Sequence, residues 1–172
     1  MRRFPIWYLV FALAFMTNCD ALESTTDDDA NDDQTNDRPD EGWEADMLAA
    51  INQLRSEGCD CGSETMPPVP ALAWNEKLEA AAVRHSDDMA ANEFMAHEGS
   101  DGSHVGDRVT SAGYDWSSVG ENVAHGYPTV EQVMEGWRNS EGHCKNMMNA
   151  AFTEFGAAVN DDYWTQVFAK PR

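Results

Sequence analysis

Basic residues are scarce in this 172-residue chain, which has 11 Lys and Arg against 31 Asp and Glu and a formal net charge of −20. Proteins bind nucleic acid largely by neutralising phosphates with Lys and Arg, so a chain without a basic patch excludes nucleic acid as a partner. The sequence also lacks an internal repeat and any sign of a second folded domain. Its length and composition fit one modest globular domain with additional segments.

A long hydrophobic stretch is also missing. The apolar run near the N-terminus, FPIWYLVFALAFM, is too short to cross a bilayer comfortably. It follows a positive start, MRR, and precedes a small-residue end, TNCDAL, which is the layout of a secretory signal. We therefore predict a signal peptide over residues 1–18 and an exported protein.

Cys19 stands where a bacterial lipoprotein signal places its acylated cysteine, although the preceding MTN departs from the usual Gly, Ala or Ser. Acyl chains there would anchor the protein to a membrane without a transmembrane helix, whereas cleavage nearby would release a free secreted protein. Asp and Glu dominate residues 20–46, with Arg38 as their one basic residue. Such a tract cannot bury enough apolar surface to order itself, so residues 19–46 are predicted to be an acidic disordered tether.

Cysteine is scarce as well, with four in the chain. If Cys19 is acylated, Cys59, Cys61 and Cys144 remain, enough for one disulfide and one free thiol. A bridge within Cys59-Asp60-Cys61 would close a strained small ring, so Cys61–Cys144 and Cys59–Cys144 both stay open. Either bridge would contribute about 4 kcal/mol in the loop-entropy model. A zinc site from Cys59, Cys61 and His143 is disfavoured in an oxidising compartment.

Apolar periodicity predicts helices in the first part of the folded region. Residues 47–58 have helical spacing and Gly58 as a stop, and residues 74–92 form a second helix with Asn75 as its N-cap. A short helical piece runs through Val109, and residues 128–140 form a third helix with Pro128 in its first turn. Residues 142–150 begin another short helical turn.

Strand patterns come last in the chain. Residues 152–160 and 161–170 alternate with period two around Asp161-Asp162, which predicts an antiparallel hairpin. Residues 59–72 contain three prolines and are expected to be an irregular connection, and GENVAHGY, residues 120–127, is too irregular for an ordinary strand or helix. Helices followed by strands predict an α+β fold in which helices pack on a small antiparallel sheet.

Three titratable residues stand in Gly- or Ser-rich junctions: His97 in FMAHEGSDGS, Glu121 in GENVAHGY and His143 in NSEGHC. Two imidazoles and a carboxylate can bind a divalent metal, as in open zinc sites. They can also form a proton-transfer pair in which Glu121 orients one ring, or a hydrogen-bonded cluster that joins three loops. His85 lies on the inward stripe of its predicted helix and is interpreted as a core histidine with a satisfied ring nitrogen.

An activated nucleophile is missing from the sequence. Ser86, Ser103 and Ser140 stand near histidines along the chain, but no G-x-S-x-G elbow is present. A Cys–His protease is disfavoured because Cys144 is adjacent to His143 and export favours its oxidation. The residues therefore favour a binding role over an enzymatic one.

Five motifs occur in a familiar order: FMAHEGSDGS, GDRVTSAGY, GENVAHGY, GWRNSEGHCKNMMNAAFTEFGAAV and YWTQVFA. Their order and spacing resemble the bacterial CAP-domain proteins, whose superfamily includes cysteine-rich secretory proteins, antigen 5 and pathogenesis-related proteins. The resemblance extends from about Met47 to Phe168 and places an SCP-like CAP domain at residues 47–172. It implies an α–β–α sandwich, with a central antiparallel sheet between helical layers.

The resemblance also implies a surface cavity lined by His97, Glu121 and His143, which could hold a divalent metal such as zinc, although no cofactor is required. Glu141 is a candidate second cavity acid, since WRNSEGH is shortened and Glu141 takes a place where bacterial relatives usually carry Pro. Bacterial relatives carry cysteine at the positions of Cys61 and Cys144, which favours that disulfide.

The function that the resemblance implies is an exported binding module, lipid-anchored at Cys19 or free, whose His/Glu cavity holds a metal, a lipid or a protein. Its partner is an extracellular ligand, and it meets a membrane only through the lipid anchor. The alternative is a metal-assisted hydrolase that acts on peptides or envelope polymers. A purely structural envelope protein is the third hypothesis.

Overall fold

The structure is a computed structural model that describes residues 42–172, and the predicted signal peptide, Cys19 and most of the predicted tether lie outside these residues. The described elements are, in chain order, α1 (Trp43–Glu57), β1 (Cys59–Cys61), β2 (Glu64–Met66), β3 (Ala73–Trp74), α2 (Glu76–Asn92), α3 (Val105–Ser111), β4 (Trp116–His125), α4 (Val130–Arg138), α5 (Glu141–Met147), β5 (Glu154–Asn160) and β6 (Tyr163–Pro171). Within residues 42–172, no helix combines the length and apolarity that a membrane span needs.

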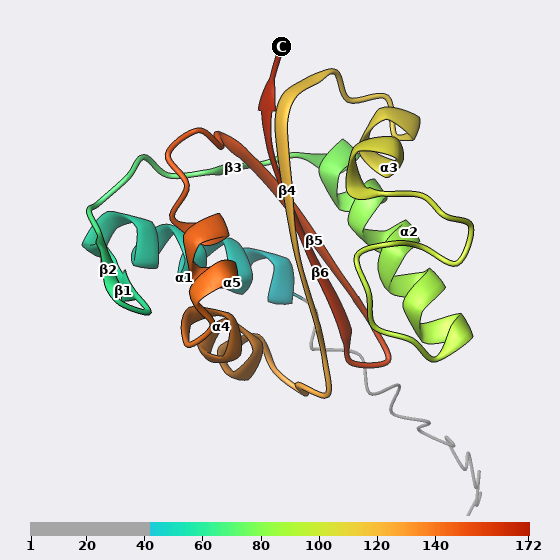
Figure 1. Cartoon of the computed structure of the whole chain (residues 1–172), viewed down its shortest axis with the longest axis horizontal. Coiled ribbons are helices and arrows are strands. Elements are labelled where there is room, and N and C mark those ends of the chain that lie inside the picture. Colours follow the sequence, from blue (N-terminus) through green and yellow to red (C-terminus); the bar gives the residue numbers. More distant parts are fainter. Residues whose placement is uncertain (1–41) are drawn as a thin grey trace, which may run out of the picture. The chain divides into compact units, whose positions relative to one another are not determined.

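A four-stranded sheet of order β3-β5-β6-β4 lies between two helical layers (Figure 1). Helices α2 and α3 cover one face, and α1, α4 and α5 cover the other. One apolar cluster fills each side of the sheet, the larger one beneath α1 and α4. The predicted α–β–α sandwich is confirmed.

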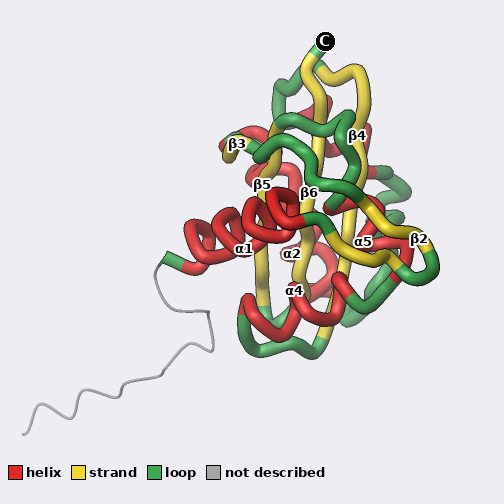
Figure 2. Tube along the Cα trace, turned by 90° about the vertical axis from the view of Figure 1, so that its left-hand side faces the viewer, coloured by secondary structure: helices red, strands yellow, loops and turns green. Residues whose placement is uncertain are grey.

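The long strands β5, β6 and β4 are antiparallel, as the turned view shows (Figure 2). The short edge strand β3 adds a parallel pair, Ala73 with Glu154 and Trp74 with Phe155, that the sequence did not predict. Strands β5 and β6 are buried over most of their length because helices cover both faces.

The predicted β5–β6 hairpin is confirmed. Its turn residues Asp161 and Asp162 have φ angles of 45° and 57°, which is the left-handed backbone that two-residue hairpins require. The pair Asn160 and Tyr163 closes the hairpin.

The interpretation of residues 120–127 as irregular is wrong, because residues through His125 belong to β4, which pairs with β6 along its length. The pattern was misleading because Glu121 and Asn122 are adjacent buried polar residues on opposite faces of the strand. Residues 59–72 are not wholly irregular either. They contain the β1–β2 hairpin, in which Cys59 pairs with Met66.

The predicted helix signals fare better. Asn75 caps α2 by accepting a hydrogen bond from the Lys77 amide at 2.9 Å, and Gly58 ends α1 with a φ of 75°. Helix α1 begins earlier than expected, at Trp43, whose ring packs edge-on against Trp164 at 5.6 Å. Pro128 precedes the N-cap Thr129 instead of lying in the first turn of α4.

A buried arginine joins α1 to its neighbours. Arg55 is fully buried and donates to the carbonyl oxygens of Pro70, Met147 and Phe152. It thereby ties the segment before β3 and the end of α5 to α1. Because its guanidinium is buried and hydrogen-bonded inside the domain, Arg55 does not contribute to a basic surface.

Gly156 in β5 marks the closest approach of α2 to the sheet. A Cβ built there would overlap the backbone nitrogen of Glu79 and lie 2.5 Å from the carbonyl carbon of Leu78. Because backbone atoms cannot move aside as a flexible side chain can, Gly156→Ala is expected to lower the free energy of unfolding by about 1–3 kcal/mol, measured by urea denaturation.

Gly142→Ala is the matched control, since no neighbouring heavy atom lies within 4 Å of its added Cβ. Its helical position predicts unchanged stability or a gain of up to about 1 kcal/mol. Equal urea midpoints for the two variants would contradict the close packing of α2 on β5.

Candidate functional site

The centre of the candidate site is the buried carboxylate of Glu121 in β4, which is 5 % exposed. One oxygen, Oε1, lies 2.9 Å from Nδ1 of His97, and the other, Oε2, accepts a hydrogen bond from Nη2 of Arg108 at 2.7 Å. Arg108 is itself 2 % exposed. The buried acid therefore has a buried cationic partner, as a carboxylate in this environment requires.

Arg108 also fixes the loop that carries His97. Its guanidinium donates to the carbonyl oxygens of Ser103 at 2.7 Å and of His97 at 3.0 Å. The same side chain thus holds the backbone of His97 and the carboxylate that binds its ring. Although the backbone and Nδ1 are held, 60 % of the His97 side chain stays exposed.

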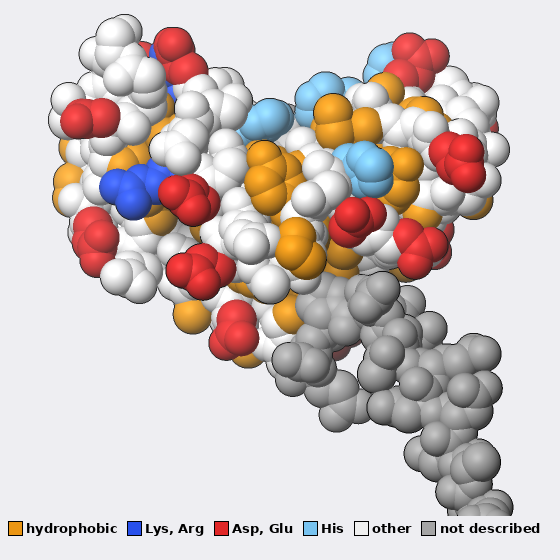
Figure 3. All heavy atoms as spheres, turned by 90° about the horizontal axis from the view of Figure 1, so that it is seen from below, with side chains coloured by type: hydrophobic (Ala, Val, Ile, Leu, Met, Phe, Trp, Pro, Cys, Tyr) orange, Lys and Arg blue, Asp and Glu red, His pale blue; other side chains and the backbone are white. Residues whose placement is uncertain are grey.

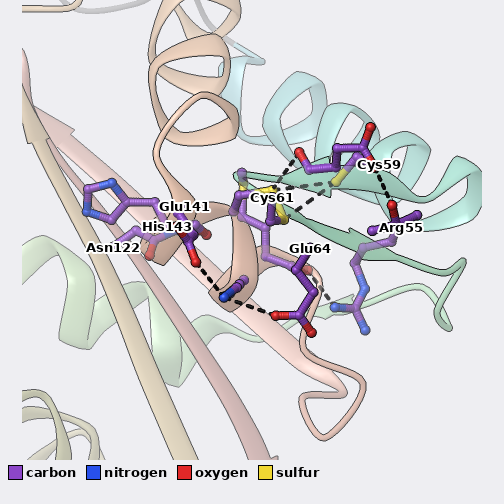
Figure 4. Close-up of a disulfide and its surroundings, with 12 residues drawn as sticks. Arg55, Cys59, Cys61, Glu64, Asn122, Glu141 and His143 are labelled. Carbon is purple, nitrogen blue, oxygen red and sulfur yellow. Dashed lines mark hydrogen bonds and ion pairs between the residues drawn. A yellow bond between two sulfur atoms is a disulfide. The ribbon is translucent and has the colours of Figure 1, made fainter.

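His143 reaches β4 from the other face of the sheet. Its carbonyl accepts a hydrogen bond from Nδ2 of Asn122 at 3.2 Å, and Nδ2 of Asn146 donates to the Glu121 carbonyl at 3.0 Å. Figure 4 shows the His143 ring beside Asn122, pointing away from the disulfide. The loop that carries His97 and the helix that carries His143 therefore both contact strand β4, at the edge of the sheet opposite β3.

The surface is hollowed between two lobes when seen from below, and histidine side chains lie along the hollow (Figure 3). The imidazoles of His97 and His143 have pKa shifts in opposite directions. The hydrogen bond that His97 donates to Glu121 raises the pKa of His97, whereas burial, aided by the charge of His97, lowers the pKa of His143.

His85 is a core histidine, as predicted. It is fully buried, and its Nε2 lies 2.8 Å from the carbonyl oxygen of Ala96. The same nitrogen is 3.9 Å from Oε1 of Glu121, while Nδ1 has no partner within the described residues. Burial lowers the pKa of His85, so the neutral ring packs beside Glu121 and leaves charge compensation to Arg108.

The expected metal set of His97, Glu121 and His143 is not assembled as three direct ligands. Within residues 42–172, the one group of three such side chains whose ligand atoms all lie within 4.8 Å is a different one, Cys59, Cys61 and Cys144. Oε1 of Glu121 contacts the His97 ring, and Oε2 accepts a hydrogen bond from Arg108. Glu121 supports the His97 ring instead.

Glu141 does not act as a second acid beside Glu121 either. Its carboxylate pairs with Lys145 one turn along α5 at 2.7 Å, and Lys145 also contacts Glu64 of β2 at 3.0 Å (Figure 4). This exposed i,i+4 pair faces the β1–β2 hairpin. The shortened WRNSEGH segment therefore leaves Glu141 on the hairpin side of the helix.

A disulfide joins Cys61 of β1 to Cys144 of α5, which is the pair that the resemblance favoured. Cys59 keeps a free thiol. The three sulfur atoms form a group that could hold a metal ion if all three were thiolates. In the structure, the bridge ties the β1–β2 hairpin to the residue next to His143 (Figure 4).

Sequence reasoning missed Arg108. A buried carboxylate calls for a cationic partner, and basic residues are few in this chain. Arg108 lies in GDRVTSAGY, one of the five ordered motifs. Because few basic residues are available to pair with a buried acid, its place in that motif could have identified it as the partner of Glu121.

Residues 48–168 match the cysteine-rich secretory protein family, CAP. The chain belongs to this family. An extracellular protein containing an SCP domain from Bacillus anthracis str. Ames has the same fold, with a TM-score of 0.68 and 31% identity over 75% of this chain and 40% of that one. An outer surface protein from Borrelia burgdorferi shares the fold alone, at 19% identity and a TM-score of 0.63, over 74% of this chain and 92% of that chain.

Two Bacillus subtilis (strain 168) proteins are each 35% identical to this chain over 99 residues. They are the uncharacterized membrane protein YlbC and the uncharacterized protein YkwD. The matched region covers 58% and 56% of this chain but only 29% and 38% of those proteins. This chain therefore matches less than half of the length of either relative.

The His97–Glu121 contact predicts that His97 and His143 have different pKa values. In metal-free protein, NMR should place the pKa of His97 above its ordinary value of 6.5 and that of His143 below it. Glu121→Gln should lower the pKa of His97 because the amide cannot pair with the protonated ring. Glu141→Gln makes the same chemical change on the hairpin side and should leave the His97 titration unchanged.

These two pKa shifts make the stability of the folded protein depend on pH. Because the pKa of His97 is raised on folding, its contribution to stability is complete below the ordinary pKa and is lost as pH rises through the raised one. His143 has the opposite shift, so its contribution is present above the ordinary pKa and is lost as pH falls toward the lowered one. Identical His97 titrations in wild type and Glu121→Gln would contradict the contact.

Proposed function

We propose that this protein is an exported CAP-domain binding module that takes a divalent metal ion such as zinc on the imidazoles of His97 and His143. The observation that carries this proposal is the 2.9 Å contact between Glu121 and Nδ1 of His97, which leaves Nε2 of a largely exposed ring available. Histidines that bind metals commonly donate their second ring N–H to a carboxylate, which fixes the tautomer and orientation.

The donor set fits such an ion in a specific way. His97 and His143 would be the direct ligands, and Glu121, neutralised by Arg108, would orient one of them. Two imidazoles leave coordination positions open, so a bound ion would act as a Lewis acid for an extracellular lipid or protein ligand.

Binding is favoured over hydrolysis because, within residues 42–172, the side-chain hydrogen bonds of the histidine rings do not include one to a Ser, Thr or Cys nucleophile. The Ser103 hydroxyl, in the same loop as His97, lies 3.4 Å from the Arg108 guanidinium. A general base must be within hydrogen-bond reach of the proton that it removes.

Zinc calorimetry tests the metal site. Wild-type protein should bind zinc, and His97→Ala or His143→Ala should each weaken binding at least tenfold, because one of two direct ligands is lost. His125→Ala is the control, since His125 stacks on Tyr163 at the end of β4 and contacts Asp162. Equal zinc affinities in all four proteins would refute the proposal, provided that circular dichroism shows them folded.

The hydrolase alternative has its own requirement. Zinc-dependent cleavage of a peptide or cell-wall polymer library that disappears in folded Glu121→Gln would establish it and displace the binding proposal. Zinc binding without such turnover supports the binding module.

Export belongs to the same proposal. A signal peptide over residues 1–18, acylation of Cys19 and an acidic tether would present the CAP domain away from the membrane surface. The Bacillus anthracis relative is described as an extracellular protein, which supports export.

Mass spectrometry of the mature protein tests this arrangement. We expect an N-terminal peptide that begins at Cys19 and carries the added mass of acyl chains. A different, unmodified N-terminus after residue 18 would replace the anchored form with a free secreted one, and retention of residues 1–18 in the mature protein would refute export.

A further inference from the structure

The third cysteine lies beside the disulfide. The Sγ atom of Cys59 is 3.5 Å from Sγ of Cys144 and 3.8 Å from Sγ of Cys61. Cys59 and Cys61 are two residues apart in β1, so their side chains project from the same face of the strand toward α5. One cysteine of the helix therefore faces two cysteines of the strand (Figure 4).

We propose that Cys59, Cys61 and Cys144 form an intramolecular thiol–disulfide exchange site. The Cys59 thiolate attacks Sγ of Cys144, the Cys59–Cys144 bond forms, and the Cys61–Cys144 bond breaks. Cys61 leaves with the electron pair as a thiolate and takes up the proton that Cys59 gave up. One thiol and one disulfide are present before and after, so the step needs neither an oxidant nor a reductant.

Proximity favours attack on Cys144 over attack on Cys61, and in-line displacement requires the Cys59 side chain to rotate, since its Sγ lies beside the Cys61–Cys144 bond. Cys144 is the nearer sulfur. A Cys59–Cys61 bond would join residues two apart on an extended strand, whose Cα atoms lie about 6.6 Å apart at ~3.3 Å per residue, near the upper limit for a disulfide. A Cys59–Cys144 bond instead replaces one strand-to-helix bridge with another.

The surroundings of Cys59 permit a nucleophile without strongly activating it. Burial raises the pKa of its thiol, Arg138 opposes this effect, and Asp60 adds to it. The thiol therefore predominates at neutral pH, and exchange proceeds through a minor thiolate population.

The two isomers differ in which thiol solvent can reach. In the structure the free thiol is Cys59, which is partly exposed, whereas Cys61 is fully buried. Exchange would transfer the thiol to that buried position while keeping α5 bridged to the hairpin. The site would thus hide or present one thiol to external disulfides without releasing the helix that carries His143.

Thiol mapping of the folded full-length chain tests the proposal. After equilibration in a glutathione buffer and acid quenching, free thiols are labelled with N-ethylmaleimide under denaturing conditions. Asp-N then cuts before Asp60, which puts Cys59 and Cys61 on different peptides, and Cys19 is measured on its own peptide. We expect labelling of Cys61 in excess of that of Cys144, and this excess should vanish in Cys59→Ser, where no attacking thiol is present.

Labelling of Cys59 with no excess at Cys61 over Cys144 in wild type would overturn the proposal. Cys61→Ser gives a second measurement, because its folded form should acquire a Cys59–Cys144 disulfide and lose at least nine-tenths of the labelling at both positions. Full labelling of both cysteines in folded Cys61→Ser would also overturn it. Should that variant fail to fold, the wild-type mapping decides. The outcome is independent of zinc binding at His97 and His143.

Discussion

The site of this CAP domain depends on the ion pair between Glu121 and Arg108. A carboxylate withdrawn from water costs several kcal/mol unless a counter-charge and hydrogen bonds replace its hydration. Arg108 supplies both, and it also holds the backbone of the loop on which His97 stands. Removing either partner would leave the other charge buried without compensation. The position of the exposed imidazole is therefore set by a pair that solvent barely reaches.

Strand β4 makes contacts on both faces of the sheet because successive side chains point to opposite faces. Glu121 meets Arg108 on one face, and Asn122 meets Asn146 and the backbone of His143 on the other. Gly120 precedes them where the Phe152 ring would lie 2.8 Å from an added Cβ. Three consecutive residues thus place the loop, the helix and the core relative to one strand.

Much of the fold could be predicted because its signals are local. The Asn75 cap, the Gly58 stop and the Asp161-Asp162 turn each depend on neighbouring residues. Strand β4 escaped prediction because Glu121 and Asn122 read as loop residues until their distant partners are known. The ordered motifs identified the family and pointed to His97, Glu121 and His143, but not to whether the carboxylate binds an ion or orients a ring.

That distinction between ligand and support explains why a fixed residue can remain exposed. The His97 ring is 60 % exposed while the acid that holds it is 2 % exposed by side chain. Glu121 contacts Nδ1 of the His97 ring, so this contact does not cover the other ring nitrogen, Nε2. His143 is placed differently, through its backbone carbonyl and through the disulfide at the next residue. One imidazole is oriented by its side chain and the other by its helix.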